Sequence, residues 1–258
     1  METLAKPIIP TGPGSVPVCD VHGLKKAFEY TIFEEQKVMY FCDQCSEKLQ
    51  QEQNDRAEAV KAMQRKLLVE RRLEESMISP RFKDKTLSNW DASSPEQKKV
   101  LKIAKDFLEN DRSPGLIFIG KPGTGKNHLA CGIAVEYIKN HFKTALVTST
   151  MKLLRAIKEC WNNKEQLEAN VIKKFKDVDL LVIDEIGVQF CSETESIYIT
   201  EIINERYEWL KPTILISNLN MIEITKLLGD RVIDRFREGG EVAVFNWESK
   251  RRESYEGK

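Results

Sequence analysis

The sequence predicts an α/β fold built on a parallel, doubly wound sheet, preceded by a small cysteine-bearing module and a long helix. Three observations support this prediction. From Pro80 onward, short continuous apolar runs alternate with segments of helical character. A glycine-rich loop follows the first apolar run, and two adjacent carboxylates follow the third.

Five apolar runs are the predicted strands. Because these runs are continuous rather than alternating, we expect each strand to be covered by helices on both faces of the sheet. The segments between them are long enough for the crossover helices that parallel strands require. The predicted strands are residues 116–119, 145–147, 180–183, 214–216 and 242–245.

Length and composition limit the classes of protein. The 258 residues can form an α/β core of about 180 residues and leave an appendage. Forty basic residues balance forty acidic ones, so any nucleic-acid surface must be a local patch. We expect a cytoplasmic protein without membrane association, because the chain has no signal peptide and no apolar run of about 18 residues.

Composition also predicts three domains. Residues 1–49 hold a Pro- and Gly-rich tail and the cysteine module, residues 50–78 form a helical linker, and residues 79–258 form the α/β domain. In the linker, Val60, Met63 and Leu67 share one face of a helix that is otherwise mostly charged. This pattern fits a polar connector or a partner-binding helix, and both interpretations stay open.

The N-terminal module contains two pairs of metal-ligand residues. Cys19 and His22 form one pair, and Cys42 and Cys45 form the other. A reducing compartment does not favour disulfides, whereas three thiolates and one imidazole complete a tetrahedral Zn²⁺ shell. Because that shell leaves no open position, we expect a structural zinc-binding module; the alternative is two unrelated pairs of buried thiols.

The glycine-rich loop has the spacing of a P-loop that binds ATP. Its turns let backbone N–H groups converge on phosphate oxygens, and the helix predicted over residues 128–139 adds its positive end. Lys126 would reach the β- and γ-phosphates. Asn127 replaces the usual hydroxyl ligand of Mg²⁺, and its longer side chain predicts slow hydrolysis. The loop residues are Gly120, Lys121, Pro122, Gly123, Thr124, Gly125, Lys126 and Asn127.

Two carboxylates complete the predicted nucleotide site. Asp184 and Glu185 follow a buried strand about 60 residues after the P-loop. Asp184 would bind Mg²⁺ directly or through water, and Glu185 would orient the attacking water. The alternative is that both carboxylates only cap the next turn.

Three segments resemble the DnaC family of AAA+ helicase loaders: GKPGTGKNHLA, VDLLVIDEIGVQ and TKLLGDRVIDRFR. The resemblance covers about residues 80–252 and includes Asn127, since the family pattern also has Asn after the P-loop lysine. It implies an AAA+ P-loop NTPase with ATP and Mg²⁺ as cofactors. Residues 1–49 depart from the family pattern, whose N-terminal domain is helical and contacts the helicase.

The resemblance implies three further site residues. Asn218 matches the sensor-1 residue, Arg235 matches an arginine finger that acts on a neighbouring subunit's nucleotide, and Arg251 matches sensor 2. Arg252 adjoins Arg251 and fits that role equally well. Each residue also has a simpler reading, as a strand-end Asn, a surface Arg and part of a basic C-terminal run.

Loaders of this kind carry an extra helix that faces DNA. Lys158 and Trp161 lie three residues apart in the matching region, so they share a helix face. A lysine beside an aromatic side chain suits single-stranded DNA, through phosphate neutralisation and base stacking. The alternative places Trp161 in the core and Lys158 in water.

We therefore expect an ATP-dependent loader that self-associates and places a hexameric DnaB-type replicative helicase on single-stranded DNA. Its hydrolysis of ATP would be slow and stimulated by DNA or a partner. Two alternatives stay open: the ATPase subunit of a DNA transposition system that selects target DNA, and a nucleotide-gated adaptor with little turnover. The ending TKLLGDRVIDRFREGGEVAVFNWES favours the loader, whereas Asn127 keeps the adaptor open.

Overall fold

The computed structural model describes residues 26–32, 35–41, 43–110, 113–161, 168–187 and 193–249. The chain divides into two compact units, residues 1–67 and residues 68–258. The division between the units falls inside the long helix and matches neither predicted boundary, after residue 49 or after residue 78. The three predicted domains therefore stay predictions. Within the ranges given above, no helix is both long and apolar enough to cross a membrane.

The first unit contains an antiparallel hairpin. Strands β1 (Lys26–Ile32) and β2 (Glu35–Phe41) pair along their whole length, with Lys26 opposite Phe41. The hairpin lies in the sequence between the two pairs of predicted zinc ligands.

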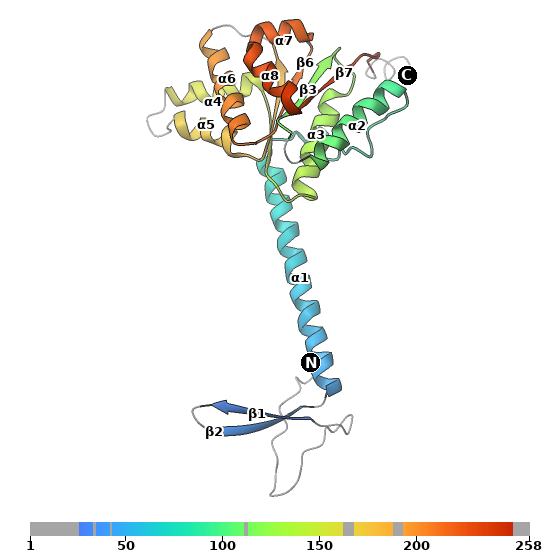
Figure 1. Ribbon diagram of the computed structural model, residues 1–258, viewed down its shortest axis with the longest axis vertical. Helices are drawn as coiled ribbons and strands as arrows, with labels where there is room; N and C mark the ends of the chain where they lie inside the picture. The colour runs from blue at the N-terminus through green and yellow to red at the C-terminus, as the bar shows by residue number, and fades with distance from the viewer. Residues whose placement is uncertain are drawn as a thin grey trace, which may run out of the picture. The chain divides into compact units, whose positions relative to one another are not determined.

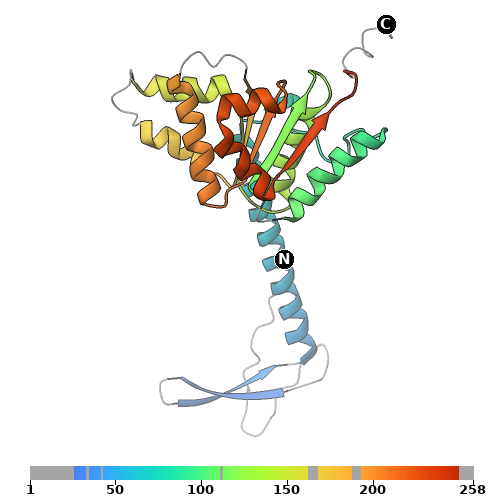
Figure 2. The ribbon, with the colours of Figure 1, turned by 45° about the horizontal axis from the view of Figure 1, so that its top comes forward.

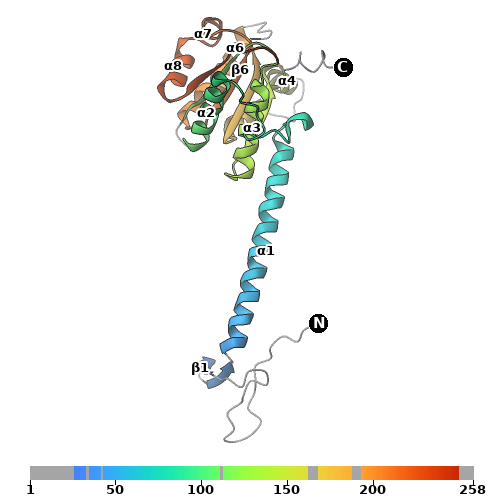
Figure 3. The same cartoon turned by 90° about the vertical axis from the view of Figure 1, so that its right-hand side faces the viewer.

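Helix α1 (Asp43–Glu75) is one continuous helix (Figure 3). It begins at Asp43, earlier than the predicted start at residue 50, so Cys45 belongs to its first turn. The apolar face predicted for the linker is accessible to solvent: Val60 and Met63 are each 56% exposed and Leu67 is 51% exposed.

The second unit is a five-stranded parallel sheet (Figures 1 and 2). The strand order is β4-β5-β6-β3-β7, and every neighbouring pair runs parallel. All five predicted strands are confirmed, each with a slightly longer extent. They are β3 (Gly115–Gly120), β4 (Ala145–Ser149), β5 (Leu180–Ile186), β6 (Thr213–Ser217) and β7 (Glu241–Phe245).

Helices cover both faces of the sheet, which confirms the doubly wound fold. Alternate residues of a strand point to opposite faces, so Leu116 and Phe118 of β3 enter one core and Ile117 and Ile119 the other. The first core packs against α2 (Pro95–Glu109) and α3 (Lys126–Lys139). The second packs against α4 (Thr150–Trp161), α5 (Glu168–Asp177), α6 (Glu193–Glu208), α7 (Met221–Leu228) and α8 (Asp230–Gly239).

The start of α2 shows how local sequence signals set the elements. Ser94 caps the helix through a capping box with Gln97, and proline occupies the first helical position. Apolar residues then recur at helical spacing and are buried, among them Val100, Ile103 and Phe107. The helix therefore begins where the sequence pattern changes and turns its apolar face to the sheet.

The register brings three strand ends together at one edge of the sheet. In β3 and β6, Ile119 pairs with Ser217, so Gly120 and Asn218 follow at the same edge. In β5 and β6, Ile183 pairs with Leu215 and Ile186 pairs with Ser217, so Asp184 lies close to the same edge. Ligands of open parallel sheets bind at the carboxyl ends of the strands.

Candidate nucleotide-binding site

The P-loop connects β3 to α3. At two of its positions, any residue other than glycine would be strained. Gly120 has a φ of 139°, and a Cβ atom there would lie 2.3 Å from the backbone oxygen of Phe245. Gly125 has a φ of 98°, in the region that L side chains rarely adopt. The spacing of the glycines in the motif therefore follows from the backbone path of this loop.

Lys126 is the first residue of α3, and its ammonium group is held inside the loop. The residue is 6% exposed. Its Nζ atom donates hydrogen bonds to the backbone oxygens of Gly120 (2.6 Å) and Lys121 (2.8 Å) and to Oδ1 of Asn218 (3.0 Å). The predicted P-loop lysine and the predicted sensor-1 residue are thus in direct contact.

Asn127 and Asp184 form a second contact beside Lys126. Nδ2 of Asn127 donates a hydrogen bond to Oδ2 of Asp184. Burial raises the pKa of the Asp184 carboxyl, although the N–H of Glu185, the Asn127 amide and the Lys126 charge oppose that rise. Here the amide nitrogen of Asn127 faces Asp184, so Asn127 would have to turn its oxygen toward the carboxylate to complete the all-oxygen donor set that Mg²⁺ takes.

Glu185 occupies a backbone conformation that few residues adopt. Its φ is 60°, and the pairing of β5 with β6 shifts register between Ile183 and Ile186. Its N–H donates to Oδ1 of Asp184 at 2.7 Å, while its side chain is exposed to the cavity. The irregularity turns Glu185 out of the strand and beside the predicted metal ligand.

These residues line a cavity of about 490 Å³. The cavity also includes four residues that the sequence motifs did not predict: Arg81, Phe82, Lys85 and His128. The first three belong to the 3-10 helix η1 (Pro80–Phe82) or follow it closely, and no motif identifies them. The remaining lining residues are Pro122, Gly123, Gly125, Lys126, Asn127, Asp184, Glu185 and Asn218.

Comparison with known proteins supports a nucleotide-binding site. The family described as "IstB-like ATP binding protein" matches residues 19–254 of the chain. The chain belongs to this family of ATP-binding proteins. The replicative helicase loader DnaC of Escherichia coli strain K12 is 36% identical over 199 residues, which cover 76% of this chain and 81% of that protein.

Solved structures show the same fold. The crystal structure of the DnaC helicase loader matches 64% of this chain and 99% of its own, with a TM-score of 0.57 and 24% identity. The replication initiator DnaA bound to AMPPCP and single-stranded DNA matches 67% of this chain and 52% of its own, with a TM-score of 0.56 and 26% identity. The α/β fold of this IstB-like protein is thus that of the AAA+ P-loop proteins.

Arg235, the predicted finger of this IstB-like protein, lies on α8 and is not among the residues that line the nucleotide cavity. Its guanidinium donates to the backbone oxygen of Asn204 (3.3 Å) and to the Asn204 side chain. It also pairs with Glu208 (3.3 Å) and lies 4.7 Å from the ring centre of Tyr207. Arg235 therefore rests on α6.

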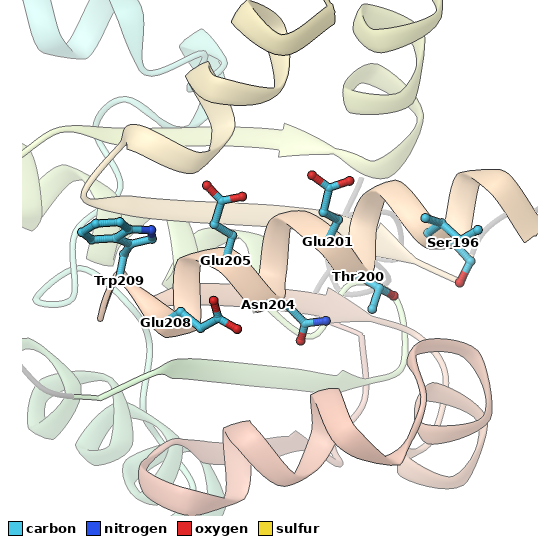
Figure 4. A pocket seen from close by; sticks show the side chains of 8 residues that line it. Ser196, Thr200, Glu201, Asn204, Glu205, Glu208 and Trp209 are labelled. Atoms are coloured by element: carbon cyan, nitrogen blue, oxygen red, sulfur yellow. The ribbon is translucent and has the colours of Figure 1, made fainter.

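An open groove of about 620 Å³ runs along α6 beside this contact (Figure 4). Asn204 and Glu208 point to one side of the helix, and Glu201 and Glu205 point to the other (Figure 4). Glu201 and Glu205 both pair with Lys176 of α5. Helix α6 is thus linked by ion pairs to α5 on one side and to α8 on the other.

The predicted DNA residues lie on α4. Lys158 is exposed on this helix, and its ammonium pairs with Glu195, a nearly buried carboxylate of α6. Trp161 is the last residue of α4, and its side chain lies outside the described residues. At the other end of α4, the Thr150 hydroxyl donates to the backbone oxygen of Asp184 (3.2 Å), which joins this helix to the nucleotide site.

Several predicted site residues lie outside the described part of the chain. They are Cys19, His22, Cys42, the side chain of Cys45, and Arg251. Within the part that is described, no group of three metal-ligating side chains forms a metal site. Cys131 and Cys160 are buried as small core residues, and burial raises the pKa of the Cys131 thiol to about 12.

Proposed function

We propose that this protein is an ATP-dependent loader that places a hexameric replicative helicase of the DnaB type on single-stranded DNA. The observation that carries the proposal is the 36% identity to the replicative helicase loader DnaC across 76% of the chain. The contact between Lys126, Asn218 and the P-loop backbone supports the ATP-dependent part.

The proposed nucleotide chemistry divides between four residues. Lys126 binds the β- and γ-phosphates, and Asn127 and Asp184 hold Mg²⁺. When bound, Mg²⁺ neutralises phosphate charge during hydrolysis of ATP. Glu185 accepts a proton from, and orients, the attacking water; its position beside Asp184 and its exposure to the cavity support this role.

Two further residues complete the proposed catalytic set. Asn218 contacts Lys126 at 3.0 Å and is therefore placed to meet the γ-phosphate once the lysine turns toward it. Arg235 rests on α6 outside its own cavity, which supports a role on the nucleotide of a neighbouring copy. Arg251 is the proposed sensor-2 residue. Turnover would then require self-association.

The proposed DNA contacts are Lys158 and Trp161 on α4. The exposed position of Lys158 supports a phosphate contact, and Thr150 joins the same helix to Asp184. Phosphate neutralisation and base stacking together bind a single strand without reading its sequence. This arrangement would let the nucleotide site and DNA influence each other.

The N-terminal part is proposed to bind the helicase. It consists of a zinc module in residues 1–49 and a helical linker in residues 50–78, followed by the ATPase domain in residues 79–258. The exposed apolar face of α1 supports partner binding by the linker. The proposed Zn²⁺ ligands are Cys19, His22, Cys42 and Cys45.

The zinc proposal has a direct test. Protein purified without added metal should contain one Zn²⁺ per chain by elemental analysis, and a chelator should unfold only the N-terminal module. A control variant with Cys131→Ala should keep its zinc, because this cysteine is buried in the ATPase domain. A zinc content near zero with a folded module would exclude a zinc site.

Two assays test the main proposal. The tagged full chain should copurify with a hexameric helicase, and ATP turnover should rise when single-stranded DNA or that helicase is added. Lys126→Ala should lose ATP binding, whereas Glu185→Gln should keep binding and lose turnover, since an amide cannot accept the proton. Copurification with a transposase instead would favour the transposition system. Tight ATP binding without turnover under any condition would favour the adaptor.

A further inference from the structure

Two tryptophans outside the phosphate-binding motif hold the P-loop. Nε1 of Trp247 donates a hydrogen bond to the backbone oxygen of Thr124 at 3.0 Å. Nε1 of Trp90 donates to the backbone oxygen of Gly125 at 3.3 Å. Trp90 precedes its acceptor by 35 residues and Trp247 follows its acceptor by 123 residues, so the fold and not the local sequence brings them here.

These hydrogen bonds help to fix two successive peptide planes; the Gly125 carbonyl also accepts the N–H of Leu129 at 3.0 Å. All peptide bonds in the described part of the chain are trans, so each carbonyl oxygen and the following N–H point in opposite directions. A loop that turns its N–H groups toward phosphate must therefore turn the matching carbonyls the other way, where they need donors. The indole N–H groups supply donors to the carbonyls that precede Gly125 and Lys126.

The two indoles are themselves held in an aromatic cluster. Trp90 and Trp247 pack edge to face with ring centres 6.0 Å apart, and Phe245 lies 5.1 Å from Trp247 and 6.3 Å from Trp90. Trp90 is only 6% exposed. A Cβ atom at position 125 would lie 3.0 Å from Nε1 of Trp90, so this glycine also allows the close approach of the indole.

We infer that Trp247 and Trp90 are positioning residues for the nucleotide. They orient the peptide planes of Thr124–Gly125 and Gly125–Lys126 so that the N–H groups of Gly125 and Lys126 face the phosphates. The inference rests on the proposed binding of ATP and goes beyond it, because it assigns part of the affinity to residues that never touch the nucleotide. Trp247 lies two residues after the end of β7, and Glu248 beside it pairs with Lys121 at 3.5 Å. The segment after β7 therefore contacts the P-loop at both Thr124 and Lys121.

The test removes the N–H group while keeping an aromatic ring. Trp247→Phe in the full chain should bind a fluorescent ADP analogue about three- to tenfold more weakly, the share of one neutral hydrogen bond. Trp90→Phe should weaken binding by less, because its hydrogen bond is longer. Trp209→Phe is the matched control: Trp209 is 72% exposed, and its loss should leave ADP affinity unchanged.

A purely structural role gives a different result. It would lower the melting temperature of Trp247→Phe without changing the ADP affinity of the folded protein, and that outcome overturns the inference. Should Trp247→Phe fail to fold, benzothienylalanine at position 247 decides the question, because it keeps the shape of the indole and lacks the N–H. If the unchanged chain binds no ADP, the proposed ATP binding fails instead.

Discussion

Replacing Asp184 with Asn should stabilise the nucleotide-free protein while removing its Mg²⁺-dependent function. Burial raises the pKa of the Asp184 carboxyl above its ordinary value, so the charged form is held at a cost in the folded state. The amide is neutral and nearly the same shape. Its single carbonyl oxygen can still accept the N–H of Glu185, and its N–H₂ group can donate to Asn127 once that side chain turns its amide oxygen toward it. The attraction to Lys126 is lost.

The sign of the pH dependence follows from the direction of the shift. Between the unfolded pKa and the higher folded pKa, the folded state binds more protons than the unfolded state, so stability falls as pH rises through this range. The full cost of the charge is present above the folded pKa, at neutral pH. The stabilisation by Asp184→Asn should therefore be largest there and shrink toward pH 4.

The expected gain is modest because Asp184 is only partly buried and three groups offset its burial. We expect about 0.5–1 kcal/mol, in the lower range of single stabilising substitutions. For a domain of this size, that gain raises the melting temperature by roughly 1–4 °C. Melting curves from pH 4 to pH 8, without nucleotide, measure the effect, and melting with MgATP should show no further rise in the variant.

The matched control is Asp106→Asn. Asp106 is exposed on α2, where it pairs with Lys102, so its replacement should change the melting temperature little. If Asp184→Asn melts below the unchanged protein at neutral pH, or if the difference does not depend on pH, the argument from burial is wrong.

Four other substitutions have defined outcomes. Arg206→Leu should lower the free energy of unfolding by about 3–5 kcal/mol in urea titrations, because the buried guanidinium donates to five backbone carbonyls. Arg235→Ala should bind ATP but not hydrolyse it. Mixing it with Lys126→Ala should restore part of the turnover in a coupled assay, because Arg235→Ala supplies an intact P-loop and Lys126→Ala supplies the arginine. Lys158→Ala should reduce the salt slope of single-stranded DNA binding by about 0.7, whereas Glu195→Gln should tighten binding by freeing that lysine; titrations at several salt concentrations measure both.

Controls for these variants come from exposed residues of the same type. Arg231→Ala, on α8, should leave turnover and stability near those of the unchanged chain, and Lys98→Ala, on α2, should leave DNA binding unchanged. No recovery of turnover at any mixing ratio would mean that Arg235 does not act across a subunit boundary. Unchanged DNA binding by Lys158→Ala would remove α4 from the DNA surface.

The sheet and the centre of the site could be predicted because their signals are local. Each buried strand is a continuous apolar run. The P-loop and Asp184 directly follow two of these runs, and Asn218 lies two residues after a third. Once the strands are parallel, their carboxyl ends meet at one edge. The contact between Lys126 and Asn218, 92 residues apart, therefore follows from the order of the strands.

The rest of the site could not be predicted, because it depends on contacts without a local signal. Arg81, Phe82 and Lys85 line the cavity from a segment with no motif. The carbonyls of Thr124 and Gly125 accept hydrogen bonds from Trp247 and Trp90, whose distance along the chain gives no hint of a shared partner. Hydrogen bonds of this kind are found only when the whole fold is known.

The contacts of Lys126 suggest how binding of a phosphate changes the site. An ammonium group has three N–H donors, and in this structure Lys126 directs them to two loop carbonyls and to Asn218. A phosphate oxygen must therefore replace one of these acceptors. The carbonyls of Gly120 and Lys121 are fixed by the loop, whereas the Asn218 side chain lies exposed at the end of β6. Asn218 is thus the acceptor most readily displaced, and its amide N–H₂ would then become available to the same phosphate, as the proposed sensor-1 role requires.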